Sequence, residues 1–224
     1  IDRLVVLGGV SLVFWTLTLQ TTIKYVLLTL RADNKGEGGI FSLYTLVRRR
    51  EKWLLYPALL GGAAMISDGM ITPPISVSSA VEGLEIKYPG LPTVGITIAI
   101  ISLLFFVQRF GTAAVGKSFG PIMFIWFLLL GILGVTNISH DLEVLSALSP
   151  HYGIKLLMSN PKGIFILGAV FLCTTGAEAL YADLGHCGRE NIQTSWIFVK
   201  TCLVLNYLGQ AAWLLHHEGM PLTE

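Results

Sequence analysis

Six long apolar stretches, separated by polar segments, dominate the pattern of this chain. They cover residues 4–30, 57–81, 93–108, 119–138, 163–182 and 196–215. An α-helix rises 1.5 Å per residue and the hydrocarbon core of a bilayer is about 30 Å thick, so about 20 apolar residues can cross it. The pattern predicts an all-α polytopic membrane protein, in which residues 1–224 form a transmembrane region with six helices.

The composition agrees with this fold class. Of the 224 residues, 53% are hydrophobic and 13% are charged, whereas soluble domains average about 25% charged residues. The formal net charge of +1 gives no reason to expect a nucleic-acid surface, so the expected surroundings are a lipid bilayer. The three cysteines lack metal-ligand spacing, and the five histidines lie in or beside loops, so neither residue type predicts a metal site.

The distribution of basic residues predicts the orientation. The segment 31–56 is rich in arginine and lysine, which is typical of a cytoplasmic loop. If the spans alternate, nine basic residues lie inside (Arg31, Lys35, Arg48, Arg49, Arg50, Lys52, Arg109, Lys117, Arg189) and four outside (Arg3, Lys87, Lys155, Lys162). Lys24 and Lys200 fall within spans. We therefore expect a multi-pass protein of the cell membrane, which is the inner membrane in a Gram-negative bacterium.

The second apolar stretch carries an acidic residue near its middle. Asp68 is followed by Thr72 and Ser76 at intervals of four, so their oxygens lie along one face of a helix. A carboxylate at that depth costs about 2.5 to 3.5 kcal/mol on insertion scales and usually faces a bundle interior or a watery cavity. Oxygen atoms are the ligands that hard cations prefer. The pattern predicts a cation site.

Two prolines lie within the same face. Pro73 and Pro74 have no amide hydrogen and clash with carbonyls near Gly69 and Met70, so backbone oxygens could be freed there. The alternative is that the hydroxyls bond their own backbone and the prolines only kink the helix. Asp68 favours the functional interpretation, because an ionisable residue in hydrocarbon is a functional candidate by default.

The fifth stretch contains a second acid. Glu178 follows Thr175 by three residues on the same helical face, and Gly176 lies between them. The glycine can be interpreted as a site of close helix packing. Together with Thr174, it can equally mark an unwound segment whose carbonyls and helix ends face a cation. Two carboxylates in separate spans, each one turn from a hydroxyl, suggest a shared cation site.

Several motifs occur in order along the chain. They are SLVFWTLTLQTTIKYVLLTLRADNKGEGGIFSLYTLV, DGMITPPISVSSAVEGLE, FGPIMFIWFLLLGILGVTNI, TTGAEALYADLGH and LVLNYLGQAAWLL. In sequence and spacing they resemble the second, third, fifth, sixth and seventh spans of the KUP family of potassium uptake transporters, also called HAK or KT. From spacing alone, the GEGG within the first motif is interpreted as a turn.

The resemblance implies a potassium importer with the inverted-repeat fold of the amino acid, polyamine and organocation transporter superfamily. Such proteins have about twelve spans and a cytoplasmic C-terminal domain, and they move potassium together with protons. By resemblance, the ion site is lined by the residues matching the family's ligands, namely Asp68, Thr72, Ser76, Thr175 and Glu178. The resemblance implies no cofactor, and K⁺ and H⁺ are the transported ions. A homodimer of the full-length protein is left open.

The chain departs from the family pattern in a few places. Ser67, Pro74 and Cys187 replace residues common in relatives, and only the helix geometry near Pro74 is put in doubt. The first-span motif of the form GDxGTSPLY and the later spans are not in this sequence. Both ends look cut from a longer protein, and this chain alone is not expected to transport.

The mechanism we expect uses the two acids as proton carriers. Held between helices with reduced solvation, Asp68 and Glu178 would bind protons more readily when the site is empty. Bound potassium favours their ionised form, so exchange of the two charges could couple the two gradients. Asp68 and Glu178 are therefore the candidates for proton coupling, and the sequence does not say which of them carries the proton.

Other functions have distinguishable requirements. An amino acid or polyamine carrier of the same superfamily needs a substrate-sized cavity. A potassium channel needs a filter loop like TVGYG, which this sequence lacks. An intramembrane enzyme that holds a divalent metal and a diphosphate calls for clustered aspartates, and a structural subunit gives no reason for Asp68 and Glu178. The expectation is a transporter and not an enzyme.

Overall fold

The computed structural model describes residues 2–109 and 112–216, and the described residues divide into two units. Unit 1 comprises Ile1–Leu46 and Phe124–Glu224, and unit 2 comprises Val47–Met123. The two units are described separately below.

The described part of the chain is almost entirely helical. Its elements are α1 (Arg3–Thr16), η1 (Leu17–Leu28), η2 (Thr29–Arg31), α2 (Ile40–Val47), η3 (Lys52–Leu54), α3 (Leu55–Glu85), α4 (Thr93–Gln108), α5 (Thr112–Ile138), η4 (Leu142–Leu148), α6 (Pro150–Ser159), α7 (Gly163–Leu172), α8 (Ala177–Ala182), α9 (Leu184–Cys187) and α10 (Arg189–His216).

Four of these helices are long and apolar enough to cross a membrane. They cover Arg3–Arg31, Lys52–Glu85, Gly116–Ile138 and Arg189–His216, and Thr93–Val107 and Gly163–Leu172 are shorter apolar helices. The all-helical prediction is confirmed, and the long apolar helices agree with a polytopic membrane protein. The count of six crossings stays a prediction.

Two helix starts differ from the sequence prediction. The fourth apolar helix was expected from residue 119, but α5 begins at Thr112, so Pro121 lies in its interior. The sixth was expected from residue 196, whereas α10 begins at Arg189. In both cases the helix continues through a polar segment, because hydropathy marks the apolar part of a helix and not its ends.

The first apolar helix changes its hydrogen-bond register part-way along. It is α-helical up to Thr16, π-helical in η1, and ends with one 3₁₀ turn in η2. The π register lets the Thr22 hydroxyl donate to the Leu17 carbonyl, five residues back, at 3.1 Å. π-helical segments are rare and are frequently found at functional sites.

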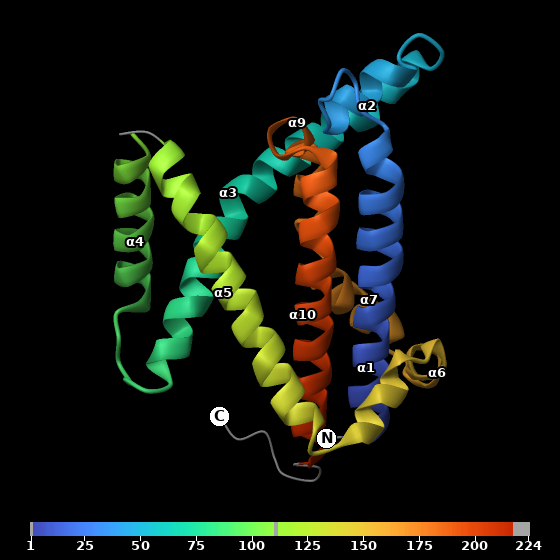
Figure 1. The fold of residues 1–224 in the computed structure, drawn as a ribbon, viewed down its shortest axis with the longest axis vertical. Coiled ribbons are helices and arrows are strands. Elements are labelled where there is room, and N and C mark those ends of the chain that lie inside the picture. The colour runs from blue at the N-terminus through green and yellow to red at the C-terminus, as the bar shows by residue number, and fades with distance from the viewer. Residues whose placement is uncertain (1, 110–111, 217–224) are drawn as a thin grey trace. The chain divides into compact units, whose positions relative to one another are not determined.

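Unit 1 is organised around α1 and α10, which lie side by side in Figure 1 and contact each other. Helices α6 and α7 also pack against α1. One buried cluster joins the start of α1 to the end of α10 (Val6, Leu7, Ile138, Val144, Ala147, Leu208, Ala211, Ala212, Leu215). A second joins η1 to α8, α9 and the start of α10 (Val13, Leu17, Val26, Leu30, Val170, Tyr181, Leu184, Ile192, Trp196).

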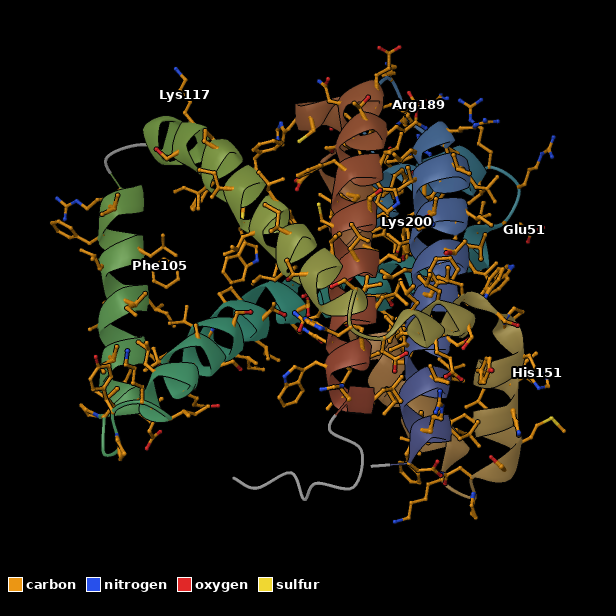
Figure 2. The ribbon with its side chains drawn as sticks, turned by 60° about the horizontal axis from the view of Figure 1, so that its bottom comes forward. Glu51, Phe105, Lys117, His151, Arg189 and Lys200 are labelled. Carbon is orange, nitrogen blue, oxygen red and sulfur yellow. The ribbon has the colours of Figure 1, made fainter. Side chains whose placement is uncertain are left out.

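A charged side chain lies within this helix pair. Lys200 is half-buried on α10, on the side that faces α1 (Figure 2), and its Nζ is 5.9 Å from the centre of the Phe14 ring. Such a cation–aromatic contact lowers the cost of a lysine in an apolar region.

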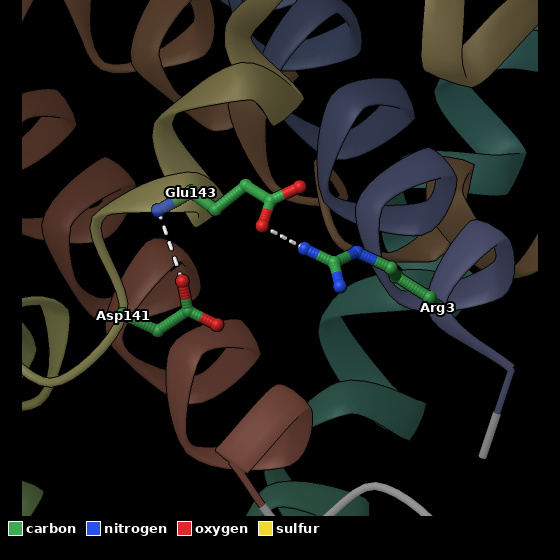
Figure 3. A network of polar contacts seen from close by, with 3 residues as sticks. All are labelled: Arg3, Asp141 and Glu143. Atoms are coloured by element: carbon green, nitrogen blue, oxygen red, sulfur yellow. Dashed lines mark hydrogen bonds and ion pairs between the residues drawn. The ribbon is translucent and has the colours of Figure 1, made fainter.

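A polar network joins the N-terminal end of α1 to the segment before α6. The Arg3 guanidinium pairs with the Glu143 carboxylate, and the Glu143 amide donates to Asp141 Oδ1 at 2.9 Å (Figure 3). The orientation predicted from the basic residues stays a prediction.

Unit 2 is built on α3 and α4, which pack against each other. The turn between them is closed by the Thr93 hydroxyl, which donates to Glu85 Oε2 at 3.1 Å. Most large apolar side chains of α3 and α4 are exposed, as expected for surfaces that face lipid or other parts of a longer membrane protein.

Candidate functional site

Asp68 and Thr72 are in direct contact on α3. The Thr72 hydroxyl donates a hydrogen bond of 2.8 Å to Asp68 Oδ1. The bond holds the carboxylate against the helix surface, and no other hydrogen bond to it is found among the residues that the structure describes. Asp68 is half-buried, and Thr72 and Ser76 are exposed within the described residues. The spacing of four thus brings the first two predicted residues together, with Ser76 one turn further along the same helix.

The proline pair does not interrupt α3, which is continuous from Leu55 to Glu85. Pro73 and Pro74 cannot donate to the carbonyls four residues back, at Gly69 and Met70. Those two carbonyls therefore lose their usual donors within a continuous helix, and their residues directly follow Asp68 in the chain.

The fifth apolar stretch is broken. Helix α7 ends at Leu172, α8 begins at Ala177, and Gly176 between them has φ +92°, in the left-handed region that favours glycine. Of the two interpretations of Gly176, the unwound segment is the one that the structure bears out. A Cβ at this position would meet nothing within 4 Å, so the glycine serves the turn and not close packing.

Backbone oxygens are released at this break, which comprises residues 173–176. The amides of Cys173, Thr174 and Thr175 donate to carbonyls three residues back, in 3₁₀-type turns. The Gly176 amide instead donates to Glu178 Oε1, at 3.4 Å. The carbonyl oxygens of Cys173 and Thr175 accept no hydrogen bond from any residue that the structure describes. Free carbonyls near a carboxylate are the groups from which cation sites are built.

A cavity of about 210 Å³ adjoins the break. It lies within unit 1 and is lined by Leu17 and Thr21 of η1, by Cys173, Thr174, Thr175, Gly176, Ala177 and Leu180, and by Trp196 and Leu203 of α10. Thr175 was predicted as a site residue and lines the cavity. Glu178 does not line it, but its carboxylate bonds the amide of Gly176, which does.

The five predicted residues fall into two groups in different units. Asp68, Thr72 and Ser76 belong to unit 2, and Thr175 and Glu178 belong to unit 1. Thr72 contacts Asp68, as the spacing of four predicted. Thr175 and Glu178 do not share a helical face as predicted, because Thr175 lies in the break and Glu178 lies in α8, which begins after it. That the two groups bind one ion together stays a prediction.

Comparison with known proteins identifies the family. The sequence profile described as "K+ potassium transporter integral membrane domain" matches residues 1–221. The chain belongs to this potassium transporter family. The resemblance that the sequence motifs suggested is therefore confirmed.

Individual members of the potassium transporter family are close in sequence. Proteins named as probable Kup potassium transport system proteins are 62% identical in Flavobacterium johnsoniae, 61% in Cytophaga hutchinsonii and 60% in Clostridium perfringens. The matches cover 98%, 98% and 96% of this chain and 34% of each relative. The chain thus spans about a third of the length of these relatives. No solved structure matches it.

The names of these relatives can be compared with the other function classes considered from the sequence. The relatives are named as potassium transport proteins, and none of these names describes an enzyme or an amino acid or polyamine carrier. The family profile, described as an integral membrane domain, agrees with the long apolar helices and with a membrane protein.

One residue beside the break lay outside the prediction. Thr21 lines the cavity, yet nothing in its sequence context separates it from Thr18 or Thr22. A threonine in an apolar helix usually bonds its own backbone, so the sequence carries no signal that this hydroxyl is different.

Proposed function

We propose that the full-length protein containing this chain takes up potassium across the cell membrane by proton-coupled symport. The break of residues 173–176 carries this proposal, since it combines two unbonded carbonyl oxygens with the carboxylate of Glu178. The relatives' names as potassium transport proteins support the choice of ion.

The ligand set suits a monovalent cation. A potassium ion that leaves water needs oxygen atoms in place of its hydration shell, and neutral carbonyls and hydroxyls provide them without binding the ion too tightly. We assign five residues as ion ligands. Thr175 and Glu178 belong to unit 1, and Asp68, Thr72 and Ser76 belong to unit 2. One or two carboxylates then balance the charge of the ion.

Proton coupling follows from the chemistry of those carboxylates. A bound cation favours the ionised form of Asp68 and Glu178, and a proton on either one weakens cation binding. Alternate occupation by K⁺ and H⁺ during transport would link the two gradients. The discontinuous helix is typical of inverted-repeat transporters, and we infer that fold for the full-length protein, with a homodimer as its candidate assembly.

The direct test is Asp68→Asn in the full-length protein. The amide keeps the size of the side chain and removes its charge, so the variant should fail to restore growth of a strain deficient in potassium uptake at low potassium. Rubidium uptake should fall at least about tenfold, the effect of losing about 1.4 kcal/mol of ion binding. Unchanged growth and uptake would remove Asp68 from the site.

A matched control lies on the same helix. Glu82 also accepts a hydrogen bond from a hydroxyl one turn away, from Ser78 at 3.0 Å, but it lies near the end of α3. Glu82→Gln should leave growth and uptake unchanged, and Glu178→Gln should behave like Asp68→Asn. Loss of uptake in the control would mean that any acid on α3 is needed, and the assignment of Asp68 would fail.

The proton is tested separately, in proteoliposomes that contain the full-length protein. An inward potassium gradient should acidify the lumen, and Asp68→Asn or Glu178→Gln should abolish the acidification. Potassium uptake without acidification would reject symport and leave potassium transport standing.

A further inference from the structure

Thr21 has a buried hydroxyl group without a partner. Its side chain is 2% exposed, and its Oγ1 makes no hydrogen bond with any residue that the structure describes. Nearby threonines differ, because the Thr18 hydroxyl donates to the Phe14 carbonyl at 2.8 Å and the Thr22 hydroxyl donates to the Leu17 carbonyl. A buried hydroxyl left unpaired destabilises the fold, so this position calls for a partner.

The π register of η1 explains why Thr21 is unpaired. In an α-helix, the Thr21 hydroxyl would reach back four residues to the carbonyl of Leu17. In η1 that carbonyl accepts the hydroxyl of Thr22 instead, at 3.1 Å. The Thr22 oxygen in turn accepts the indole N–H of Trp196, at 3.0 Å. This chain of bonds fixes Thr22 and leaves the oxygen of Thr21 free.

Thr21 is one of the residues that line the cavity at the break. Thr21 shares this cavity of about 210 Å³ with Cys173 and Thr175, whose carbonyl oxygens accept no hydrogen bond from the described residues 2–109 and 112–216. The volume is enough for a cation and several waters. Leu17, Leu180 and Leu203 complete an apolar wall, so an ion in the cavity would depend on the few oxygens that line it.

The unpaired groups select the sign of the ligand's charge. At the break, the amides of Cys173, Thr174, Thr175 and Gly176 already donate, so they are not free to bind an anion. What remains are oxygen acceptors, and the carboxylate of Glu178 lies next to Gly176. A site of free carbonyls, a hydroxyl oxygen and a nearby negative charge favours a cation.

We propose that the Thr21 hydroxyl is a ligand of the transported cation at the break, and that it sets the apparent affinity for that cation. The inference rests on the proposed function and adds to it a residue from the first apolar helix. A single positive charge suits the carboxylate of Glu178, which lies beside the break.

The test compares Thr21→Val with Thr21→Ser in the full-length protein. Valine has nearly the shape of threonine without the hydroxyl, and serine keeps the hydroxyl. Rubidium uptake by Thr21→Val should show a KM raised about tenfold, equivalent to about 1.4 kcal/mol, with little change in the maximal rate. Thr21→Ser should restore a KM close to that of the unmodified protein.

A matched control and a second readout make the test decisive. Thr18→Val removes a hydroxyl that already bonds its own backbone, so its KM should not change. Potassium should raise the thermal unfolding temperature of the purified protein relative to choline, because a ligand stabilises the state that it binds. In Thr21→Val this stabilisation should be reduced, and in Thr18→Val it should be kept.

The other outcomes separate failure of the Thr21 proposal from failure of the proposed function. An unchanged KM in Thr21→Val would leave the hydroxyl without a role in binding, while uptake by the unmodified protein would keep the proposed function. Equal destabilisation of Thr21→Val with and without potassium would assign the hydroxyl to a contact with the rest of the protein. If the unmodified protein takes up no rubidium, the proposed function fails, and the potassium-dependent unfolding temperature then decides the role of Thr21 by itself.

Discussion

The hydroxyl of Tyr181 donates a hydrogen bond to the backbone carbonyl of Ala32, which lies 149 positions earlier in the chain. Tyr181 is buried in α8, directly after the break, and Ala32 follows the last turn of the first apolar helix. A second bond runs from Gln193 Nε2 to the Val26 carbonyl, at 3.1 Å. The end of the first apolar helix is therefore fastened to the segments that follow the break.

Removing the Tyr181 hydroxyl should loosen this connection. Tyr181→Phe keeps the ring in the buried cluster but leaves the Ala32 carbonyl unpaired, which should cost about 1 kcal/mol of the free energy of unfolding. We expect faster hydrogen exchange in residues 32–39 and 177–187 of the full-length protein, measured by mass spectrometry. Unchanged exchange in both segments would show that the Tyr181 bond does not hold residues 32–39 against α8.

The GEGG turn is a second point of contact with the same segment. A Cβ on Gly38 would overlap the carbonyl oxygen of Tyr181 and lie 2.9 Å from the Cβ of Leu184. Gly38→Ala should therefore force the turn away from α8 and cost about 1 to 3 kcal/mol, as overpacking does. Thermal unfolding of the purified full-length protein measures the loss.

Gly9 provides the control for that substitution. It lies within α1, and a Cβ there would meet nothing within 4 Å. Gly9→Ala should leave the free energy of unfolding unchanged or raise it by up to about 1 kcal/mol, because alanine stabilises a helix more than glycine does. A loss in Gly9→Ala as large as that in Gly38→Ala would mean that the docking of the turn is not the cause.

Two glycines let α5 and α10 approach closely within unit 1. A Cβ on Gly209 would lie 2.6 Å from the Cα of Gly134, and one on Gly134 would overlap the carbonyl of Leu205. Small residues commonly allow such contacts between membrane helices. Gly209→Ala should lower the unfolding temperature, with a cost of about 1 to 3 kcal/mol. Gly168→Ala in α7, where a Cβ meets nothing within 4 Å, should not lower it.

The ion pair of Arg3 with Glu143 should contribute little to stability. Their side chains are 42% and 58% exposed, and exposed pairs typically contribute about 0 to 1 kcal/mol. Arg3→Ala should therefore shift the free energy of unfolding by less than about 1 kcal/mol, with a smaller shift in high salt. A loss above about 2 kcal/mol in unfolding experiments at low and high salt would contradict this expectation.

The sequence by itself determined the features that depend on local order along the chain. The apolar runs predicted where helices lie, with the fifth run broken in the structure. A spacing of four predicted that Thr72 lies beside Asp68, because residues four apart meet on any helix. At Gly176 the sequence left two interpretations open. A glycine whose neighbours in space are unknown is compatible with close helix packing and with a turn.

Only the tertiary structure decided between the two interpretations of Gly176. Only the tertiary structure showed that the Thr21 hydroxyl differs from those of its neighbours. The open surroundings of Gly176 and its φ of +92° identify a break, and both depend on where other segments pass. The unpaired Thr21 hydroxyl results from the π register of η1 and from the indole of Trp196, which lies 174 positions from its partner Thr22. Contacts of such long range leave no pattern in the residues around Thr21, which is why the sequence could not reveal them.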